Sequence, residues 1–386
     1  MLLKDLCDHN IGTYGIGASA CAYNEEYPVY LRITDISDDG KLLKPFRASI
    51  NPKDYPNWKD YILKMNDLVF ARTGNSTGRN YFHNTNEQLV YAGFLIRFSI
   101  NPSKVLPRYV GYYCQSESYW NQIKTFLEGS TRPTMNAELY KSLDIPIVAR
   151  ELQQHIVDTI GSVDDLIEKN EEIINKCEEF ARAIFIEMTR KIQVFVPFGN
   201  VLSRCSTGLN PRKNFTLGHG NCFYVTIKNM SGTNVLLDSK CDKIDFDAIA
   251  KISARSHLSK GDVLFSGIGT IGRSYLCYET PTNWNISESV FCFSPNELVS
   301  SEYLYELVTS NDFISFANSN ASGAAQKGIR MSDLKTHLVP LLNKSDLEKF
   351  NSKVKPILKK ANICRQENDK LSRNKRNLLE KYFASI

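Results

Sequence analysis

The hydrophobic positions of residues 156–188 recur at intervals that alternate between four and three residues. With one polar exception, apolar or small side chains occupy Ile156, Ile160, Val163, Ile167, Asn170, Ile174, Cys177, Ala181, Ile184 and Met188. A spacing that averages about 3.5 residues keeps one stripe of a helix facing a partner helix. The pattern therefore predicts a long helix whose apolar seam is interrupted by Asn170.

The same spacing returns near the end of the chain, 194 residues later. The second seam consists of Phe350, Val354, Ile357, Ala361, Cys364, Asn368, Leu371, Lys375, Leu378 and Tyr382. Residues 151–191 carry ten acidic and five basic side chains, whereas residues 344–386 carry five acidic and twelve basic ones. Opposite net charge favours pairing of the two helices with each other.

An antiparallel pairing with Ile156 opposite Tyr382 places Asn170 opposite Asn368. In that register the two amides satisfy each other's hydrogen bonds inside an apolar seam. The alternative is that each helix is amphipathic and packs only on its own domain.

The segments that precede the two helices also repeat each other. Asn66–Gly74 aligns with Gly261–Gly269 at an offset of 195, and each stretch reads as an acidic turn, an apolar strand and a glycine-containing hairpin. Matches at an offset of 194 pair Gly78–Arg79 with Gly272–Arg273, Ile33 with Ile227, Gly129 with Gly323, Arg132 with Gln326, and Pro146 with Pro340. Agreement across separate segments indicates an internal duplication.

We predict an α+β chain of two duplicated mixed α/β domains, separated by two long helices that form an antiparallel coiled coil. The domains take residues 1–147 and 193–342, and the helices take residues 148–192 and 343–386. A length of 386 residues suits two cores of ordinary size. Charged residues follow Met1 closely and no apolar run reaches about 18 residues, so we expect a soluble, cytoplasmic protein without a membrane segment.

Neither metal nor cofactor chemistry is indicated by the sequence. The ten cysteines are scattered without CxxC spacing, and the six histidines show no metal-ligand spacing. Gly267, Gly269 and Gly272 match a dinucleotide-binding fingerprint, but a strand pattern follows them, so a β-hairpin turn is the better interpretation. Methyltransferase, Walker and nuclease motifs are absent, and we expect no catalytic residue, metal or bound cofactor.

Polar turns provide the candidates for contact with nucleic acid. The net charge of +5 is mild, so local segments say more than the total. Polar and basic loop tips can bond phosphate oxygens, and Arg and Asn can also read base edges. The hairpins offer Arg72, Asn75, Ser76, Thr77, Arg79, Ser266, Thr270 and Arg273, and two glycine-flanked segments offer Thr131, Arg132, Gln326, Lys327 and Arg330. Solvated turns are the alternative interpretation.

Taken in order, these motifs resemble the specificity subunits of type I restriction-modification systems. The resemblance rests on the duplicated hairpins and glycine-flanked segments and on Leu143–Pro146 running into Glu151–Ile156, and it covers essentially the whole chain. It implies two target recognition domains, each reading one half of a split, asymmetric sequence in double-stranded DNA. It also implies two modification subunits and restriction subunits as partners, which would bind S-adenosylmethionine, ATP and Mg²⁺.

A seam of 33 residues at about 1.5 Å per residue spans roughly 50 Å, which is enough to separate two readers by more than one turn of DNA. Leu341–Ser345 departs from the proline and glutamine residues that the family has at the start of this helix. Pro356 lies inside the seam, and a proline in a helix interior costs about 3 kcal/mol, so we expect a kink or a late start near Lys355. A duplicated scaffold that binds only protein, and an enzyme with an unrecognised site, remain alternatives.

Overall fold

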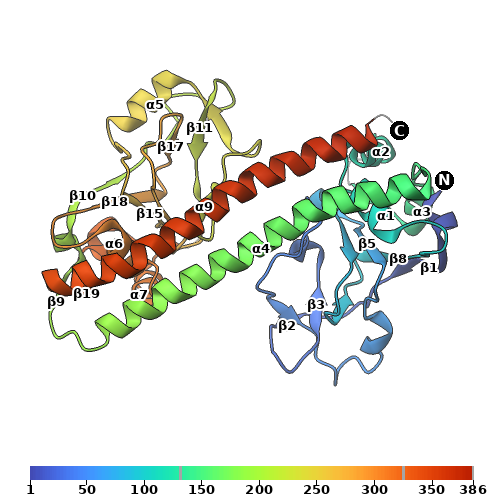
Figure 1. Ribbon diagram of the computed structural model, residues 1–386, viewed down its shortest axis with the longest axis horizontal. Coiled ribbons are helices and arrows are strands. Elements are labelled where there is room, and N and C mark those ends of the chain that lie inside the picture. Colours follow the sequence, from blue (N-terminus) through green and yellow to red (C-terminus); the bar gives the residue numbers. More distant parts are fainter. Residues whose placement is uncertain (130–132, 324–326, 385–386) are drawn as a thin grey trace. The chain divides into compact units, whose positions relative to one another are not determined.

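The computed structural model describes residues 1–129, 133–323 and 327–384. The chain forms two compact units: unit 1 comprises Met1–Ile167 and Asp369–Ile386, and unit 2 comprises Glu168–Asn368. The boundary falls inside both long helices, α4 (Arg150–Thr189) and α9 (Lys344–Phe383), which are labelled in Figure 1. Each unit therefore contains a part of α4 and a part of α9.

Unit 1 is built around an antiparallel sheet with the strand order β1-β8-β5-β6. Its strands are β1 (Cys7–Tyr14), β5 (Asp67–Ala71), β6 (Asn80–His83) and β8 (Leu95–Ile100). A second sheet, with the order β2-β4-β3-β7, consists of β2 (Cys21–Ala22), β3 (Val29–Leu31), β4 (Ala48–Ser49) and β7 (Leu89–Tyr91). The helices are α1 (Pro107–Tyr113), α2 (Glu117–Leu127), α3 (Ala137–Lys141) and 3-10 turns at Leu3–Leu6, Ile33–Asp35, Trp58–Tyr61 and Gly74–Ser76.

Aromatic side chains form the centre of the core in unit 1. Strands β5 and β8 are buried along their whole length, because elements cover both faces of the sheet. The ring of Phe70 on β5 stacks on Tyr140 with centroids 4.6 Å apart. Phe383 of α9 lies 5.4 Å from Tyr109, and Ile160 of α4 is buried in the same cluster. The long helices thus belong to the core of this unit.

Unit 2 repeats the larger sheet as β10-β18-β15-β16, again antiparallel. Its strands are β10 (Leu202–Thr207), β15 (Val263–Ser266), β16 (Ser274–Leu276) and β18 (Val290–Pro295). A sheet of order β14-β11-β17 consists of β11 (Cys222–Val225), β14 (Asp242–Ile244) and β17 (Trp284–Ile286). The two-stranded pairs are β9 (Phe195–Pro197) with β19 (Leu338–Pro340), and β12 (Met230–Ser231) with β13 (Asn234–Val235).

Short helices complete unit 2, and the long helices enter its core as well. The short helices are α5 (Phe246–Ser253), α6 (Ser301–Val308), α7 (Asn311–Ser319) and α8 (Met331–Leu334), with 3-10 turns at Phe198–Val201 and Ile227–Asn229. Phe350 of α9 lies 5.2 Å from Tyr303 of α6 and 6.4 Å from Phe185 of α4, measured between ring centroids. These aromatic contacts bring α4, α6 and α9 together.

The duplication predicted from the sequence is confirmed by the order and register of the strands. Both larger sheets have the same order, and both smaller sheets contain one parallel pair, β3 with β7 and β11 with β17. Tyr30 of β3 lies opposite Val90, and Tyr224 of β11 lies opposite Asn285. These residues are related by the offsets of 194 and 195 that relate the two halves of the sequence.

The long helices pair in an antiparallel manner in both units. In unit 1, the Lys375 ammonium lies 2.7 Å from Asp164 Oδ1, and the hydroxyl of Tyr382 lies 3.1 Å from His155 Nε2. In unit 2, Asn170 bonds Asn368, and Arg365 pairs with Glu178. In each unit, later positions on α4 meet earlier positions on α9. The alternative in which each helix packs only on its own domain is therefore wrong.

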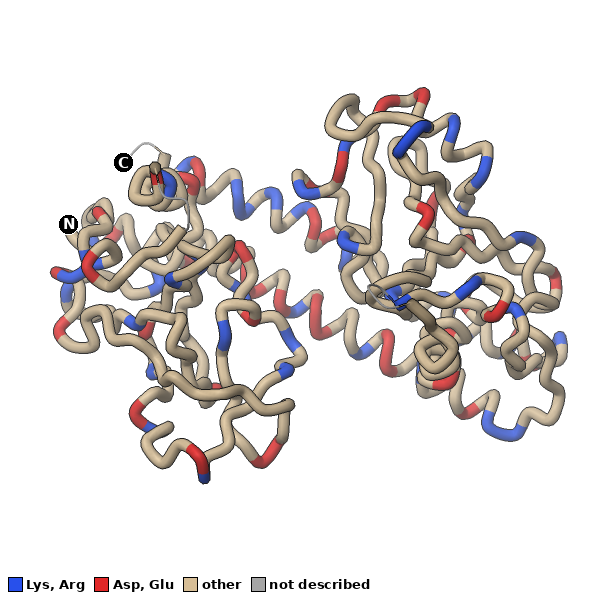
Figure 2. Tube along the Cα trace, turned by 180° about the vertical axis from the view of Figure 1, so that it is seen from behind, with Lys and Arg blue, Asp and Glu red and all other residues tan. Residues whose placement is uncertain are grey.

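Charge is distributed unequally between the two helices. Figure 2 shows acidic residues predominating along α4 and basic residues along α9. All seam positions of both helices are buried or half-buried, as the heptad spacing predicts. Among the helices that the structure describes, none combines the length and the apolar character that crossing a membrane requires.

The expected late start of the last helix is wrong. Helix α9 begins at Lys344 and continues through Pro356. Its start is fixed by Asn343, whose side-chain oxygen accepts a hydrogen bond of 2.9 Å from the backbone N–H of Asp346. Val354 and Leu358, on either side of the exposed proline, are buried in the core. This cap and this burial outweigh the cost of one missing backbone hydrogen bond.

Candidate nucleic-acid interface

In unit 1, the β5–β6 hairpin lies against the segment Pro133–Met135. The backbone N–H of Gly74 donates to the carbonyl of Pro133 at 3.0 Å, and the N–H of Met135 donates to the carbonyl of Arg72 at 2.9 Å. Thr73 and Thr134 form an isolated β-bridge between these bonds. The hairpin loop and Pro133–Met135 therefore form one surface. The candidates Thr131 and Arg132 lie outside the described residues.

Unit 2 contains the same arrangement. The N–H of Gly269 donates to the carbonyl of Lys327 at 2.7 Å, and the N–H of Ile329 donates to the carbonyl of Gly267 at 2.9 Å. Ile268 and Gly328 form the corresponding β-bridge. The candidate Gln326 lies outside the described residues. We call each combination of hairpin loop and adjoining segment a composite loop surface.

The sequence did not predict that the two candidate segments of each half lie side by side. They are separated by about 60 residues in the chain, and hydrogen bonds between loops leave no periodic pattern in the sequence. The internal repeat could have suggested this association, because both segments recur in the same order 194 to 195 residues later.

Two of the candidate hydroxyl groups point into the loops. Thr77 is buried, and its hydroxyl bonds the carbonyls of Gly74 at 2.8 Å and Pro133 at 3.0 Å. Ser266 is buried as well; its hydroxyl donates to the carbonyl of Thr270 at 2.5 Å and accepts from the N–H of Arg273 at 2.8 Å. Both side chains hold the turn in shape, and neither faces solvent.

Two candidate arginines also act within the fold. Arg79 Nε lies 2.5 Å from Asp38 Oδ1, which balances its charge. At the equivalent position of unit 2, Arg273 Nη1 donates to the carbonyls of Ile227 and Met230, both at 2.7 Å. Each arginine ties the base of its hairpin to the neighbouring loop. We infer a structural role for both from these contacts.

The remaining described candidates are available at the surface. Asn75, Thr270, Lys327 and Arg330 are exposed, and Ser76 is half-buried. These side chains supply amide, hydroxyl and cationic groups, which are the groups that bond phosphate oxygens and base edges in DNA.

Arg72 is half-buried and differs from the other hairpin candidates in its surroundings. Its guanidinium carbon lies 4.9 Å from the ring centroid of Tyr14, a cation–aromatic contact. The hydroxyl of Tyr14 accepts a 3.1 Å hydrogen bond from the N–H of Ala137, which fixes the ring. Arg72 was a candidate from the sequence and Tyr14 was not, because the two residues lie far apart in the chain.

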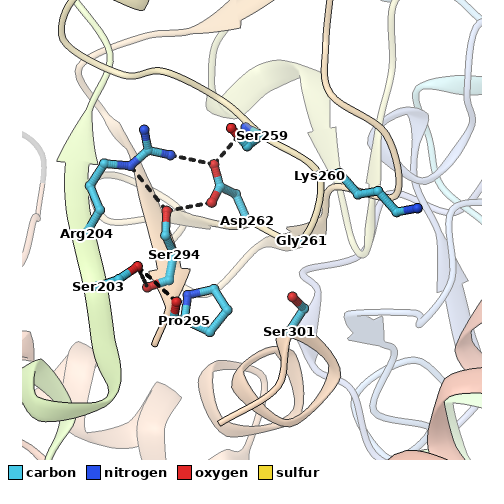
Figure 3. Close-up of a pocket in the computed structure, with 9 residues that line it drawn as sticks. All are labelled: Ser203, Arg204, Ser259, Lys260, Gly261, Asp262, Ser294, Pro295 and Ser301. Carbon is cyan, nitrogen blue, oxygen red and sulfur yellow. Dashed lines mark hydrogen bonds and ion pairs between the residues drawn. The ribbon is translucent and has the colours of Figure 1, made fainter. Parts of the chain in front are cut away.

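The acidic residue of each hairpin motif is buried and bonded. Asp262 Oδ2 accepts from the N–H of Ser259 at 2.8 Å and from Arg204 Nη2 at 2.7 Å, while Oδ1 accepts from the hydroxyl of Ser294 at 2.5 Å (Figure 3). The network fixes the turn that leads into β15. Its acid and its cation neutralise each other, so the aspartate supports the hairpin.

Unit 1 contains a related network around Asp67. Its carboxylate accepts from the N–H of Lys64 at 2.8 Å and from the hydroxyl of Ser99 at 2.5 Å. The cation is Arg97 of β8, whose Nη1 lies 3.7 Å from the carboxylate. Asp67 and Asp262 therefore stabilise the same turn in the two units. Their arginine partners come from different strands, Arg97 from β8 and Arg204 from β10.

A shallow pocket of about 390 Å³ adjoins the network of Asp262 in unit 2. Figure 3 shows the Arg204 guanidinium directed at Asp262, while the Lys260 side chain extends away from both. The acid and the base of this pocket are bonded to each other, so their charges balance within it. Burial also raises the pKa of the neighbouring Cys292 thiol well above its ordinary value, so this thiol stays protonated.

The dinucleotide-like glycines lie in the loop between β15 and β16. The element that follows them is the strand Ser274–Leu276, so the hairpin interpretation is confirmed. A Cβ at Gly267 would lie 2.4 Å from the ring of Phe291, so close packing against this ring requires glycine at this position. Within the described residues, no group of three or more His, Cys, Asp or Glu side chains is arranged to hold a metal ion.

Comparison with known proteins identifies relatives for part of the chain. Residues 1–179 match the sequence model of a family described as type I restriction modification DNA specificity domain. The HindI specificity subunit of Haemophilus influenzae is 28% identical over 139 residues, which are 35% of this chain and 30% of that protein. The MjaVIII specificity subunit of Methanocaldococcus jannaschii is 25% identical over 200 residues, 50% of this chain and 45% of that protein. The matched part spans less than half of each relative.

A solved structure extends the similarity of fold to the whole chain. The S subunit of the type I restriction-modification system from M. genitalium superposes with a TM-score of 0.54, over 99% of this chain and 94% of that chain. The sequences are 13% identical, so the likeness is one of fold. It agrees with the duplicated domains and the two long helices.

Proposed function

We propose that this chain, whose residues 1–179 match the family of type I restriction modification DNA specificity domains, gives sequence specificity to a type I restriction-modification complex. The observation that carries this proposal is the composite loop surface, which occurs once in each unit and combines backbone turns with exposed polar or cationic side chains. Two separate surfaces with the same architecture could each contact one half of a DNA target.

Each composite loop surface would contact one half of an asymmetric duplex sequence. Lys327 and Arg330 are suited to phosphate oxygens, because they are exposed cations beside the hairpin of unit 2. Asn75 and Thr270 stand at the hairpin tips, where an amide or hydroxyl can reach base edges. The long helices would hold the two readers apart.

The catalytic work would belong to partner proteins. In this proposal two modification subunits bind beside the long helices and use S-adenosylmethionine, while restriction subunits add an ATP- and Mg²⁺-dependent nuclease. Phe180 and Ile186 of α4 support a docking role, because their side chains are 60% and 56% exposed although both are large and apolar. The chain itself would methylate and cut nothing.

The proposal is tested with the chain assembled with its modification subunits. We expect binding to duplex DNA that weakens steeply with salt, and methylation at a split sequence. Exchanging residues 1–147 for the domain of a relative should change one half of that sequence and leave the other half intact. If the complex shows no salt-dependent binding to DNA, a scaffold that binds only protein becomes the better interpretation.

A further inference from the structure

The two composite loop surfaces differ at the first residue of the hairpin loop. Phe70 on β5 and Phe265 on β15 occupy equivalent places, because each pairs with the corresponding residue of the neighbouring strand. Two residues further on, unit 1 has Arg72 and unit 2 has Gly267. The ring of Phe291 occupies the space beside Gly267, so unit 2 cannot hold a side chain at this position without repacking.

The aromatic partner of Arg72 is also confined to unit 1. Tyr14 of β1 pairs with Ile96, and the equivalent residue of β10, which pairs with Phe291, is Thr207. Unit 2 thus has threonine and glycine where unit 1 has tyrosine and arginine. The scaffold of the surface is duplicated, whereas this cation–aromatic pair is not.

The backbone of Arg72 is held in place by two hydrogen bonds. Its backbone N–H donates to the carbonyl of Phe94 at 3.0 Å, and its carbonyl accepts from the N–H of Met135. Within the described part of the chain, its side chain makes no ion pair, and the buried Nε has no hydrogen-bond partner. The ring of Tyr14, which is 40% exposed, lies beside the guanidinium. This contact limits rotation of the charged group.

Two other arginines of unit 1 are neutralised by neighbouring carboxylates. Arg32 pairs with Asp35 at 2.9 Å, and Arg79 pairs with Asp38. Such pairing lowers the attraction of a guanidinium for an external anion or acceptor. Arg72 keeps its charge available beside the exposed loop tip.

We propose that Arg72, positioned by Tyr14, reads the edge of a guanine in the half of the DNA target that unit 1 contacts. This inference rests on the proposed function. Guanine presents N7 and O6 side by side in the major groove, and the planar fork of an arginine donates to both. With Nε buried, the two terminal nitrogens are left to make this contact.

The absence of the pair from unit 2 favours base reading over contact with phosphate. Phosphates lie along every DNA sequence, so a phosphate contact would serve both halves equally. A base contact is useful in one half only when the two halves of the target differ. The difference between Arg72 and Gly267 is therefore a difference in specificity.

The test uses the chain assembled with its modification subunits and a library of duplex DNA, with binding measured at several salt concentrations. We expect Arg72→Ala to lower affinity for the preferred target about 10- to 100-fold and to abolish the preference for one G·C pair in one half. The salt slope and the other half should be unchanged. Arg72→Lys should fail in the same way, since lysine keeps the charge but lacks the fork.

A modified base isolates the proposed contact. Replacing that guanine by 7-deazaguanine removes N7, and this should weaken binding of the unmodified chain while leaving Arg72→Ala unaffected. Tyr14→Leu should relax the same preference, and Tyr14→Phe should retain it because the ring remains. Arg150→Ala, which removes a cation of unit 1 at the start of α4, is the matched control and should leave the preference intact.

Two results would overturn the inference while the proposed function stands. In the first, Arg72→Ala weakens binding to all sequences alike and lowers the salt slope by about one unit, which indicates a phosphate contact. In the second, Arg72→Ala leaves selectivity unchanged. If the unmodified complex itself shows no sequence-selective binding, the proposed function fails and the inference fails with it.

Discussion

The hydrogen bond between Asn170 and Asn368 provides a direct test of how the long helices pair in unit 2. Asn170 Nδ2 lies 2.9 Å from Asn368 Oδ1 and 3.3 Å from Glu367 Oε2. Asn170→Leu places an apolar side chain in the seam but leaves the Asn368 amide without this partner. Adding Asn368→Leu makes the layer apolar on both helices.

The expected magnitude follows from the burial of the pair. A buried polar group that loses its partner costs about 1 to 3 kcal/mol. Both asparagines are half-buried, so water can replace part of the lost bond and the cost should lie near the lower end. We therefore expect Asn170→Leu to lower the free energy of unfolding by about 1 kcal/mol, and the double variant to recover most of it.

The assay needs a signal from unit 2 alone. Trp284 is the only tryptophan between residues 168 and 368. In a background with Trp58→Phe and Trp120→Phe, its fluorescence during urea unfolding reports this unit. The four members of the double-mutant cycle then give the coupling free energy between the two asparagines.

A matched control is Asn175→Leu, because Asn175 is on the same helix but exposed outside the seam. Its effect should stay within about 0.5 kcal/mol. Strictly additive losses in the Asn170 and Asn368 variants, with no coupling, would refute the reasoning about register.

Three further predictions concern charge. Burial raises the pKa of Glu306 from 4.5 to about 7, although Arg182 lies 3.1 Å away. The folded chain therefore binds a proton that the unfolded chain releases, so stability should fall by roughly 3 kcal/mol as pH rises from below 4.5 to above 7. Glu306→Gln should remove this slope in unfolding measured across that range, and an unchanged slope would contradict the assignment. Lys327→Ala should weaken binding of the assembled complex to all DNA sequences alike and lower the salt slope by about one unit, measured by titration at several salt concentrations; a changed sequence preference at constant slope would instead show base reading. Asp262→Ala should destabilise unit 2 by about 2 to 4 kcal/mol in urea unfolding, because Arg204 loses its counter-charge and the turn loses its cap; a loss below about 0.5 kcal/mol would show that the network is dispensable.

Part of the candidate site was predictable from short stretches of sequence. The hairpin and the glycine-flanked segment were found as turns, because glycine and polar residues shape a turn locally. Their side-chain directions were not predictable. Thr77 and Ser266 were candidates for DNA contact, yet both bond the loop that contains them. A hydroxyl that caps a turn and a hydroxyl that faces solvent look the same in the sequence.

The sequence by itself determined the repeat and the long helices, including the layer that contains Asn170 and Asn368. These features follow from periodicity, and periodicity is a property of the chain before it folds. The bounds 343–386 agree with the start of α9 at Lys344, whereas the late start near Lys355 expected from Pro356 is wrong, because the compensating burial of Val354 and Leu358 was not visible in the sequence.

Only the tertiary structure decided which residues meet across long separations in the chain. It joined Arg72 to Tyr14, brought Lys327 beside the loop at Gly269, and gave the buried Asp262 its partner Arg204. The physical reason is that charge and burial depend on neighbours in space. Arg79 pairs with Asp38 and supports the fold, whereas Arg72 has no carboxylate partner among the described residues, although the two side chains are identical in the sequence.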